Sequence, residues 1–323
     1  MAKAKVFVAR EIPREVEEFL AEHCDCTVWR GEEKLTYDTI LDKVQDVEGL
    51  LMGLIRVDEN FLNHAPKLKV ISNFTVGYNN FDIEAMKRRG VIGTNTAGAL
   101  DDTVADLIFG LIIGAARRIV ELDKYVKAGR WEKGQDEIFF GKDVSGSSLG
   151  IIGMGRIGYE VAKRARLGFN MEVYYHNRNR RLELEESLGV VYKDMDELLK
   201  TSDFVVVMTP LNESTYHLIG EREFSLMKED SIFINASRGK VVDQEALIKA
   251  LENRKIQAAG LDVYEREPIP KDSPLLKLDN VITLPHIGAA TQRTRDRMFM
   301  VAAKNLVQAL KGEVPDNLVP EFR

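Results

Sequence analysis

Short apolar runs alternate with helical patterns along the first hundred residues. The runs KVFVAR, GLLMGL, LKVISN and GVIGTN have the length and composition of buried strands, and apolar residues recur at helical spacing over 14–22. Strands that alternate with helices pair in parallel, because each crossover returns the chain to the same end of the sheet. The pattern therefore predicts a parallel α/β arrangement.

A second series of strand-like runs begins after an unusually apolar segment. The segment DDTVADLIFGLIIGAARR, residues 101–118, is apolar almost all round, which predicts a long buried helix at a domain crossing. The runs SLGIIG, MEVYYH, DFVVVM, SIFINA, IQAAGLDV and NVITLPH follow, separated by helix-length stretches. The segment AATQRTRDRMFMVAAKNLVQALKG then has helical spacing, and we expect it to return the chain to the first domain.

These patterns predict an α/β fold built from two doubly wound parallel sheets. We expect one domain over residues 101–287, inserted into a second domain formed by residues 1–100 and 288–323. A chain of 323 residues is long enough to bury two separate cores.

Composition and charge narrow the class of protein. Apolar residues make up 45% and charged residues 30%, which is typical of a globular chain. The net charge of −6, without a long basic run, disfavours nucleic acid and an anionic membrane surface as partners. Charged residues follow the first apolar run at once, so we expect no signal peptide or spanning helix, and a cytoplasmic location. Cys24 and Cys26 alone make neither a disulfide framework nor a zinc site, and no metal is expected.

A glycine-rich turn lies between a predicted strand and a predicted helix, which is the arrangement that dinucleotide binding requires. The residues from Gly153 to Gly158, GMGRIG, follow a strand-like run and open the helical pattern YEVAKRAR. Glycines there permit a tight turn and a close approach of pyrophosphate, and the helix N-terminus supplies N–H donors and a positive dipole. The alternative is a tight strand-to-helix turn that binds no ligand.

The end of the next strand-like run, MEVYYH, bears on cofactor choice. An NAD enzyme usually keeps an acidic residue about 20 residues after the glycines, to bind the ribose hydroxyls. This chain has Asn177 there, followed by Arg178, Arg180 and Arg181. The arginines could neutralise a 2′-phosphate, and no carboxylate repels it. NADP is therefore predicted as the preferred cofactor with NAD still usable; the alternative is a solvated basic turn.

Three polar residues follow predicted strands at the sheet edge where ligands of open α/β folds bind. Arg238 lies in INASRGKVVD, and its guanidinium suits a planar carboxylate. Glu267 and His286 form a potential carboxylate and imidazole pair, in which the carboxylate favours the imidazolium and orients the ring. Each residue taken alone also fits a plain surface or loop role.

The surrounding residues resemble the D-isomer-specific 2-hydroxyacid dehydrogenase family over essentially the whole chain. The matching pieces occur in the family's order and spacing: TVGYNNFD, LGIIGMGRIG, VVVMTPLNESTYHLIG, INASRGKVVDQEAL, AGLDVYEREP and LPHIGAAT. The resemblance implies reduction of a small 2-keto acid, glyoxylate or hydroxypyruvate, to the D-2-hydroxy acid. It implies that Arg238 holds the substrate carboxylate and carbonyl, that His286 is the acid and base, and that Glu267 supports His286.

The resemblance also implies binding roles. It implies a Rossmann-type dinucleotide-binding domain over residues 101–287, inserted into a flavodoxin-like substrate domain formed by residues 1–100 and 288–323. The backbone of Val76 and Gly77 would hold the substrate carboxylate, and Asp262 would receive the nicotinamide carboxamide. The expected cofactor-binding residues, including those derived above, are Thr103, Gly153, Met154, Gly155, Arg156, Ile157, Gly158, His176, Asn177, Arg178, Thr209, Pro210, Ala236, Ser237, Arg238, Asp262, His286 and Gly288.

Departures from the family pattern and alternative functions bound this prediction. Formate dehydrogenases of this fold carry Gln where Glu267 stands, so that activity is disfavoured. A 2-ketogluconate reductase and a short phosphoglycerate dehydrogenase stay open, and so does a dinucleotide-sensing corepressor, which shares the fold. We expect loops near Leu54, Arg56 and Tyr78, with Trp131, to set specificity. The long apolar helix and AGRWEKGQDEIFF favour a homodimer built on the cofactor domain, as in the family.

Overall fold

The chain divides into two compact units. A computed structural model describes residues 2–31, 35–53, 55–134 and 136–323. Unit 1 comprises Met1–Leu100 and Ala289–Arg323, and unit 2 comprises Asp101–Gly288. Within the described ranges, no helix is both long and apolar enough to cross a membrane.

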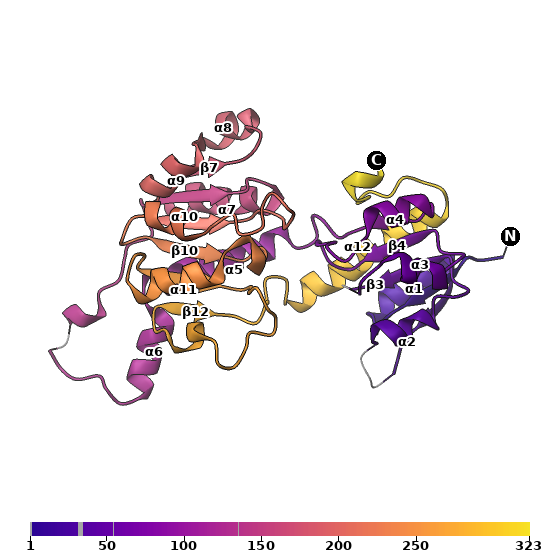
Figure 1. Ribbon diagram of the computed structural model, residues 1–323, viewed down its shortest axis with the longest axis horizontal. Helices are drawn as coiled ribbons and strands as arrows, with labels where there is room; N and C mark the ends of the chain where they lie inside the picture. Colours follow the sequence, from indigo (N-terminus) through magenta and orange to yellow (C-terminus); the bar gives the residue numbers. More distant parts are fainter. Residues whose placement is uncertain (1, 32–34, 54, 135) are drawn as a thin grey trace. The chain divides into compact units, whose positions relative to one another are not determined.

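Unit 1 is built on a five-stranded parallel sheet with strand order β2-β1-β3-β4-β5 (Figure 1). Its strands are β1 (Lys5–Val8), β2 (Asp25–Val28), β3 (Gly49–Met52), β4 (Val70–Asn73) and β5 (Ile92–Thr94). Its helices are α1 (Arg14–His23), α2 (Tyr37–Leu41), α3 (Glu59–His64), α4 (Ile83–Arg88), α12 (Gln292–Leu310) and the 3-10 turn η4 (Pro320–Phe322). This strand order is the flavodoxin-like one that the sequence predicts.

Alternating strand residues in unit 1 enter two separate cores, because successive side chains of a strand point to opposite faces. On one face, Leu50 and Ile71 pack with residues of α2, α3 and α4, such as Phe61. On the other, Leu51 and Val70 pack with residues of α1 and α12. Burial on both faces explains why these strands read as continuous apolar runs.

Unit 2 holds a seven-stranded parallel sheet with strand order β12-β11-β10-β9-β6-β7-β8 (Figure 1). Its strands are β6 (Ser148–Ile152), β7 (Glu172–His176), β8 (Val191–Tyr192), β9 (Phe204–Val207), β10 (Ile232–Asn235), β11 (Ala258–Leu261) and β12 (Val281–Thr283). The order reverses between β6 and β9, the switch point at which doubly wound sheets bind ligands. The expected pair of doubly wound parallel sheets is confirmed.

The helices of unit 2 cover both faces of this sheet. They are α5 (Asp101–Ala116), α6 (Ile119–Lys127), α7 (Arg156–Phe169), α8 (Leu182–Leu188), α9 (Met195–Thr201), α10 (Glu221–Leu226) and α11 (Gln244–Glu252). The 3-10 turns are η1 (Glu137–Phe139), η2 (Gly239–Val241) and η3 (Pro274–Lys277). Helix α5 packs on α7 and on the β10–β12 side of the sheet, and this explains its apolar surface.

The long buried helix expected over about residues 101–118 is confirmed, although it ends slightly earlier than expected. Helix α5 ends at Ala116, and Arg118 has a left-handed backbone with φ of 53° before α6 begins. The Arg118 guanidinium binds both carboxylate oxygens of Glu121, at 2.9 and 2.5 Å, and the carbonyl of Ile138 at 2.6 Å. These bonds hold the chain in a turn that redirects it away from α5.

Candidate active site

The glycine-rich turn connects β6 to α7 at the switch point. Gly153 has φ of 105°, which a side chain rarely adopts, and a Cβ there would lie 2.7 Å from the carbonyl carbon of Met208. Gly155 precedes the first residue of α7, and a Cβ on it would meet no atom within 4 Å. A helix N-terminus beside open space fits a pyrophosphate, because the N–H groups of the first turn lack helical partners.

Other predicted cofactor residues lie at the same end of unit 2. Thr209 and Pro210 follow β9, Ala236 and Ser237 follow β10, and His176 ends β7. Within the described chain, the buried Thr209 hydroxyl has no hydrogen-bond partner, as expected of a group that awaits a ligand. Two more predicted residues lie at helix starts: Thr103 is in the first turn of α5, and Arg156, the first residue of α7, pairs with Asp101 at 2.9 Å.

The turn after β7 corrects part of the cofactor interpretation. Asn177 Oδ1 accepts a hydrogen bond from the Met154 N–H at 2.6 Å, so this side chain braces the glycine-rich turn. Arg180 pairs with Glu185 at 2.5 Å, and Arg181 pairs with a neighbouring glutamate. The two arginines are therefore neutralised within the protein. Arg178 is exposed, and it is the arginine of the three best placed to meet a 2′-phosphate.

Arg238 lies in a turn that closes directly after β10. The buried Asn235 side chain donates to the Arg238 carbonyl at 3.1 Å, and its oxygen accepts from the N–H and hydroxyl of Ser237, both at 3.0 Å. Gly239 then lies against the backbone of Tyr264, where any Cβ would overlap the carbonyl carbon. This close approach brings the Arg238 turn beside the loop that carries Glu267.

Glu267 and His286 form the expected pair. His286 Nδ1 lies 2.7 Å from Glu267 Oε2, while Glu267 Oε1 accepts the Tyr264 N–H at 3.0 Å. His286 adopts φ of 55°, and the two residues that follow it donate their N–H groups to Asp262, at 2.7 and 2.8 Å. Asp262, buried at 1% exposure, thus fixes the backbone that follows His286, and its predicted contact with the nicotinamide carboxamide stays a prediction.

The electrostatics of these residues are coupled. Burial lowers the pKa of Arg238 from its ordinary value, and the Glu267 carboxylate counteracts this. Burial also acts to raise the pKa of Glu267, but hydrogen bonds from His286 and the Tyr264 N–H outweigh it and lower the pKa. Glu267 is therefore a carboxylate at neutral pH, suited to hold an imidazole by one ring nitrogen.

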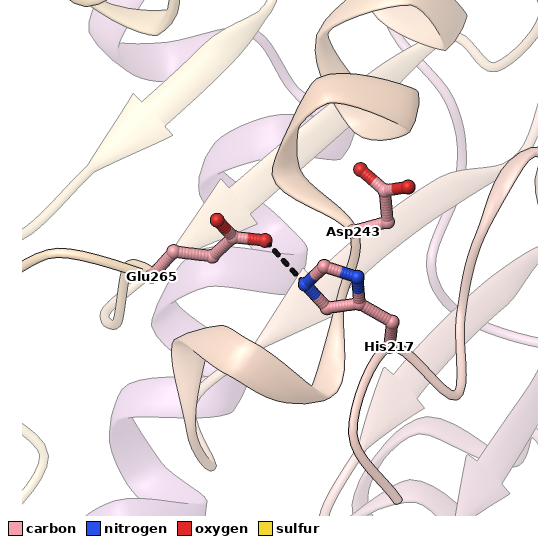
Figure 2. Close-up of side chains that lie close together, drawn as sticks. All are labelled: His217, Asp243 and Glu265. Carbon is pink, nitrogen blue, oxygen red and sulfur yellow. Dashed lines mark ion pairs between the residues drawn. The ribbon is translucent and has the colours of Figure 1, made fainter.

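A second cluster of His217, Asp243 and Glu265 lies beside these loops and was not expected from the sequence. Figure 2 shows the His217 imidazole between the two carboxylates, with Nε2 at 2.8 Å from Glu265 Oε1. Asp243 caps α11 by accepting from two backbone N–H groups, and Glu265 accepts the Gln244 N–H at 3.1 Å. The cluster joins the segment before α10, the start of α11 and the Glu267 loop, which accounts for all three side chains structurally.

The predicted carboxylate loop belongs to unit 1 and follows β4. Among the residues that the structure describes, no acceptor binds the N–H groups of Val76, Gly77 or Tyr78. The Tyr78 N–H is therefore available to a carboxylate, as are the N–H groups of the two predicted residues, Val76 and Gly77. Of the expected specificity residues, Leu54 lies outside the described residues, Arg56 pairs with Asp58 at 3.1 Å, and Trp131 is 68% exposed.

Comparison with known proteins agrees with this geometry. The family model described as D-isomer specific 2-hydroxyacid dehydrogenase, NAD binding domain, matches residues 109–288. The chain is 46% identical to a glyoxylate reductase of Korarchaeum cryptofilum over 98% of this chain and 96% of that protein. It is 44% identical to glyoxylate/hydroxypyruvate reductase B of Enterobacter sp. over 98% of each chain.

Solved structures show the same fold. A glyoxylate reductase from Paecilomyes thermophila superposes with a TM-score of 0.89 at 33% identity, covering 100% of both chains. An NADPH-dependent glyoxylate/hydroxypyruvate reductase from Sinorhizobium meliloti, in complex with NADP and malonate, superposes at 0.86 with 29% identity, covering 99% of this chain and 98% of that one. The chain therefore belongs to the D-isomer specific 2-hydroxyacid dehydrogenase family and is an NAD(P)-binding oxidoreductase that acts on the CH–OH group of 2-hydroxy acids.

Proposed function

We propose that the protein reduces glyoxylate or hydroxypyruvate to the corresponding 2-hydroxy acid, the D isomer where C2 is chiral, with NADPH preferred over NADH. The observation that carries the proposal is the His286 and Glu267 pair beside the partly buried Arg238, at the end of the sheet that bears the glycine-rich turn. Relatives named glyoxylate reductase and glyoxylate/hydroxypyruvate reductase favour these two substrates.

In the proposed reaction each residue has one task. The N–H groups of Val76 and Gly77 bind the substrate carboxylate together with Arg238. A bound reduced nicotinamide supplies the hydride that adds to C2 of the keto acid. Protonated His286 donates its Nε2 proton to the carbonyl oxygen, and Arg238 stabilises the negative charge that develops there. His286 then regains a proton from solvent.

A substrate panel with both cofactors tests this proposal. We expect oxidation of NADPH with glyoxylate and hydroxypyruvate, followed by its absorbance, at a higher kcat/KM than with 2-ketogluconate. Oxidation of the 3-phosphoglycerate hydroxyl would instead indicate a short phosphoglycerate dehydrogenase. A protein that binds NADPH and turns over none of these substrates would be a dinucleotide-sensing binding protein.

We further propose that a second copy of the chain covers an apolar surface on unit 2. Helix α6 and the segment after it project from the seven-stranded sheet (Figure 1). Large apolar side chains are exposed there, including Val126, Trp131, Ile138 and Phe140, the last at 70%. Light scattering tests this: we expect twice the monomer mass, and a smaller mass for Phe140→Asp.

Because the reaction uses NAD(P)H, we expect it to occur in the cytoplasm.

A further inference from the structure

Three consecutive carbonyl groups of the predicted substrate loop are each held by a hydrogen bond. The Thr75 carbonyl accepts the Thr96 N–H at 3.1 Å. The Val76 carbonyl accepts from Asn95 Nδ2 at 2.9 Å. The Gly77 carbonyl accepts from the Thr75 hydroxyl at 2.9 Å and, at the longer distance of 3.4 Å, from Asn73 Nδ2. All these donors belong to unit 1, as does the loop itself.

The carbonyl bonds set the direction of the N–H groups that meet the substrate. The peptide bonds of this loop are trans, and in a trans peptide the N–H points opposite to the carbonyl of the preceding residue. Holding the Val76 carbonyl therefore orients the Gly77 N–H, and holding the Gly77 carbonyl orients the Tyr78 N–H. These N–H groups donate to no acceptor in the described part of the protein, so they are available to an anion.

Asn95 is itself fixed by buried amide groups. Its carbonyl accepts from Asn305 Nδ2 of α12 at 2.9 Å, and its N–H donates to the Asn317 carbonyl at 3.1 Å. Asn317 Nδ2 in turn donates to the Ala97 carbonyl at 2.9 Å. Asn95 is 8% exposed and Asn305 is 1% exposed. Hydrogen bonds from helix α12 and the C-terminal segment thus fix the position of Asn95. Breaking them would cost free energy, because buried amide groups would be left without partners.

We propose that Asn95 and Thr75 are positioning residues for the substrate carboxylate. They act through the Val76 and Gly77 carbonyls and do not touch the substrate themselves. The inference deepens the proposed function and rests on it, because it assigns the freed N–H groups to the carboxylate of the 2-keto acid. It follows that replacing Asn95 or Thr75, which bind the loop carbonyls, should weaken the binding of an anion to the loop N–H groups. Nucleotide binding in unit 2 should be unchanged.

The test uses oxalate as a carboxylate probe on the full-length protein saturated with NADPH. Thr75→Val is nearly isosteric and removes the nearer of the two donors to the Gly77 carbonyl, leaving only Asn73 Nδ2 at 3.4 Å, whereas Thr75→Ser keeps both. Asn95→Asp places an oxygen against the Val76 carbonyl oxygen and repels it. We expect Thr75→Val and Asn95→Asp to raise the Kd for oxalate and the KM for glyoxylate about tenfold or more, with a smaller change in kcat. Thr75→Ser should behave like the parent.

Thr94→Val is the matched control. The Thr94 hydroxyl donates to the Ser72 hydroxyl at 2.8 Å inside the same core and touches none of the three loop carbonyls. It should lower stability without changing the Kd for oxalate. The inference is overturned if Thr75→Val and Asn95→Asp bind oxalate as the parent does, if Thr94→Val weakens binding equally, or if the parent binds no oxalate. A parent that binds oxalate but reduces no 2-keto acid contradicts the proposed function alone.

Discussion

His286 presents Nδ1 to Glu267 Oε2 at 2.7 Å, and this contact determines which ring nitrogen can serve a substrate. Glu267 is held in turn by the Tyr264 N–H, and the His286 backbone by the bonds of Asp262 to the next two residues. With Nδ1 committed to the carboxylate, Nε2 is the atom that can give a proton to a carbonyl oxygen.

Replacing His286 with Asn should lower turnover about 10²- to 10⁴-fold, the usual contribution of a placed general acid. The affinity for NADPH should stay close to that of the parent, because the glycine-rich turn is untouched. Steady-state kinetics and a nucleotide titration measure the two effects separately. His64→Asn, at an exposed histidine of unit 1, is the control and should have parental kinetics. Turnover of His286→Asn within about tenfold of the parent would contradict the acid role.

Replacing Arg238 with Lys should raise the KM for the keto acid and lower kcat together. A lysine keeps the charge but loses the planar fork that binds a carboxylate through two bonds. Because Arg238 is partly buried, water can replace the lost bonds only in part. Arg222→Lys, at an exposed ion pair of the same unit, should leave both constants unchanged. Parental constants for Arg238→Lys would place the carboxylate elsewhere.

The sequence predicts the sheets well where strands are buried on both faces, and poorly at their edges. Strands such as β10 (Ile232–Asn235) are wholly buried and read as apolar runs. Strands β2 (Asp25–Val28) and β8 (Val191–Tyr192) were not expected, because each pairs with only one neighbour and is partly exposed. Their apolar signal is therefore weak.

Site residues can be predicted from the sequence where a polar side chain directly follows a strand. They cannot be predicted where the site depends on contacts between loops. Arg238 and His286 stand next to apolar runs that place them at the ligand edge of the sheet. The His217 and Glu265 pair, and the bond from Asn95 to Val76, depend on how loops far apart in sequence approach each other. The pairing of Arg180 with Glu185 was missed for a different reason, because these residues are close in sequence and their contact depends on how the turn after β7 enters α8.

Asp203 should make unit 2 sensitive to acid. Its carboxylate accepts from the Ser148 N–H at 2.9 Å and hydroxyl at 2.7 Å, and from Lys142 and Lys228 at 3.2 and 3.1 Å. Burial opposes ionisation, but these donors hold the pKa of Asp203 far below its ordinary 3.8. The stabilisation is therefore complete above about pH 4, the unfolded value, and is lost as pH falls toward the folded one.

The Asp203→Asn variant should lose about 2–4 kcal/mol of stability at pH 7, because two lysines then face a neutral amide. Thermal unfolding at several pH values measures this, and the gap from the parent should narrow below about pH 4. Asp196→Asn, at an exposed pair with Arg222, should change the Tm much less. A gap for Asp203→Asn that stayed constant down to pH 2 would show that the carboxylate charge is not responsible.

Cofactor preference depends on the turn after β7. The side-chain oxygen of Asn177 accepts a hydrogen bond from the Met154 N–H, and a carboxylate at this position could accept the same hydrogen bond. Arg180 is occupied by Glu185, with an ion pair at 2.5 Å. Arg178 is exposed and lies next to the position where an NAD-selective enzyme keeps its carboxylate. The preference for NADPH should therefore depend on Arg178 and not on Arg180.

The change Arg178→Ala should lower kcat/KM for NADPH about tenfold and leave that for NADH nearly unchanged, since a charge-assisted bond at an exposed site is worth about 1–1.5 kcal/mol. Arg180→Ala is the matched control and should change neither. Adding Asn177→Asp to Arg178→Ala should reverse the preference, because the new carboxylate accepts from the ribose hydroxyls and repels a 2′-phosphate. Steady-state kinetics with both cofactors decides the matter. A parent that already favours NADH would show that these arginines form only a solvated turn. An equal loss in Arg180→Ala would show that the preference does not depend on Arg178 alone.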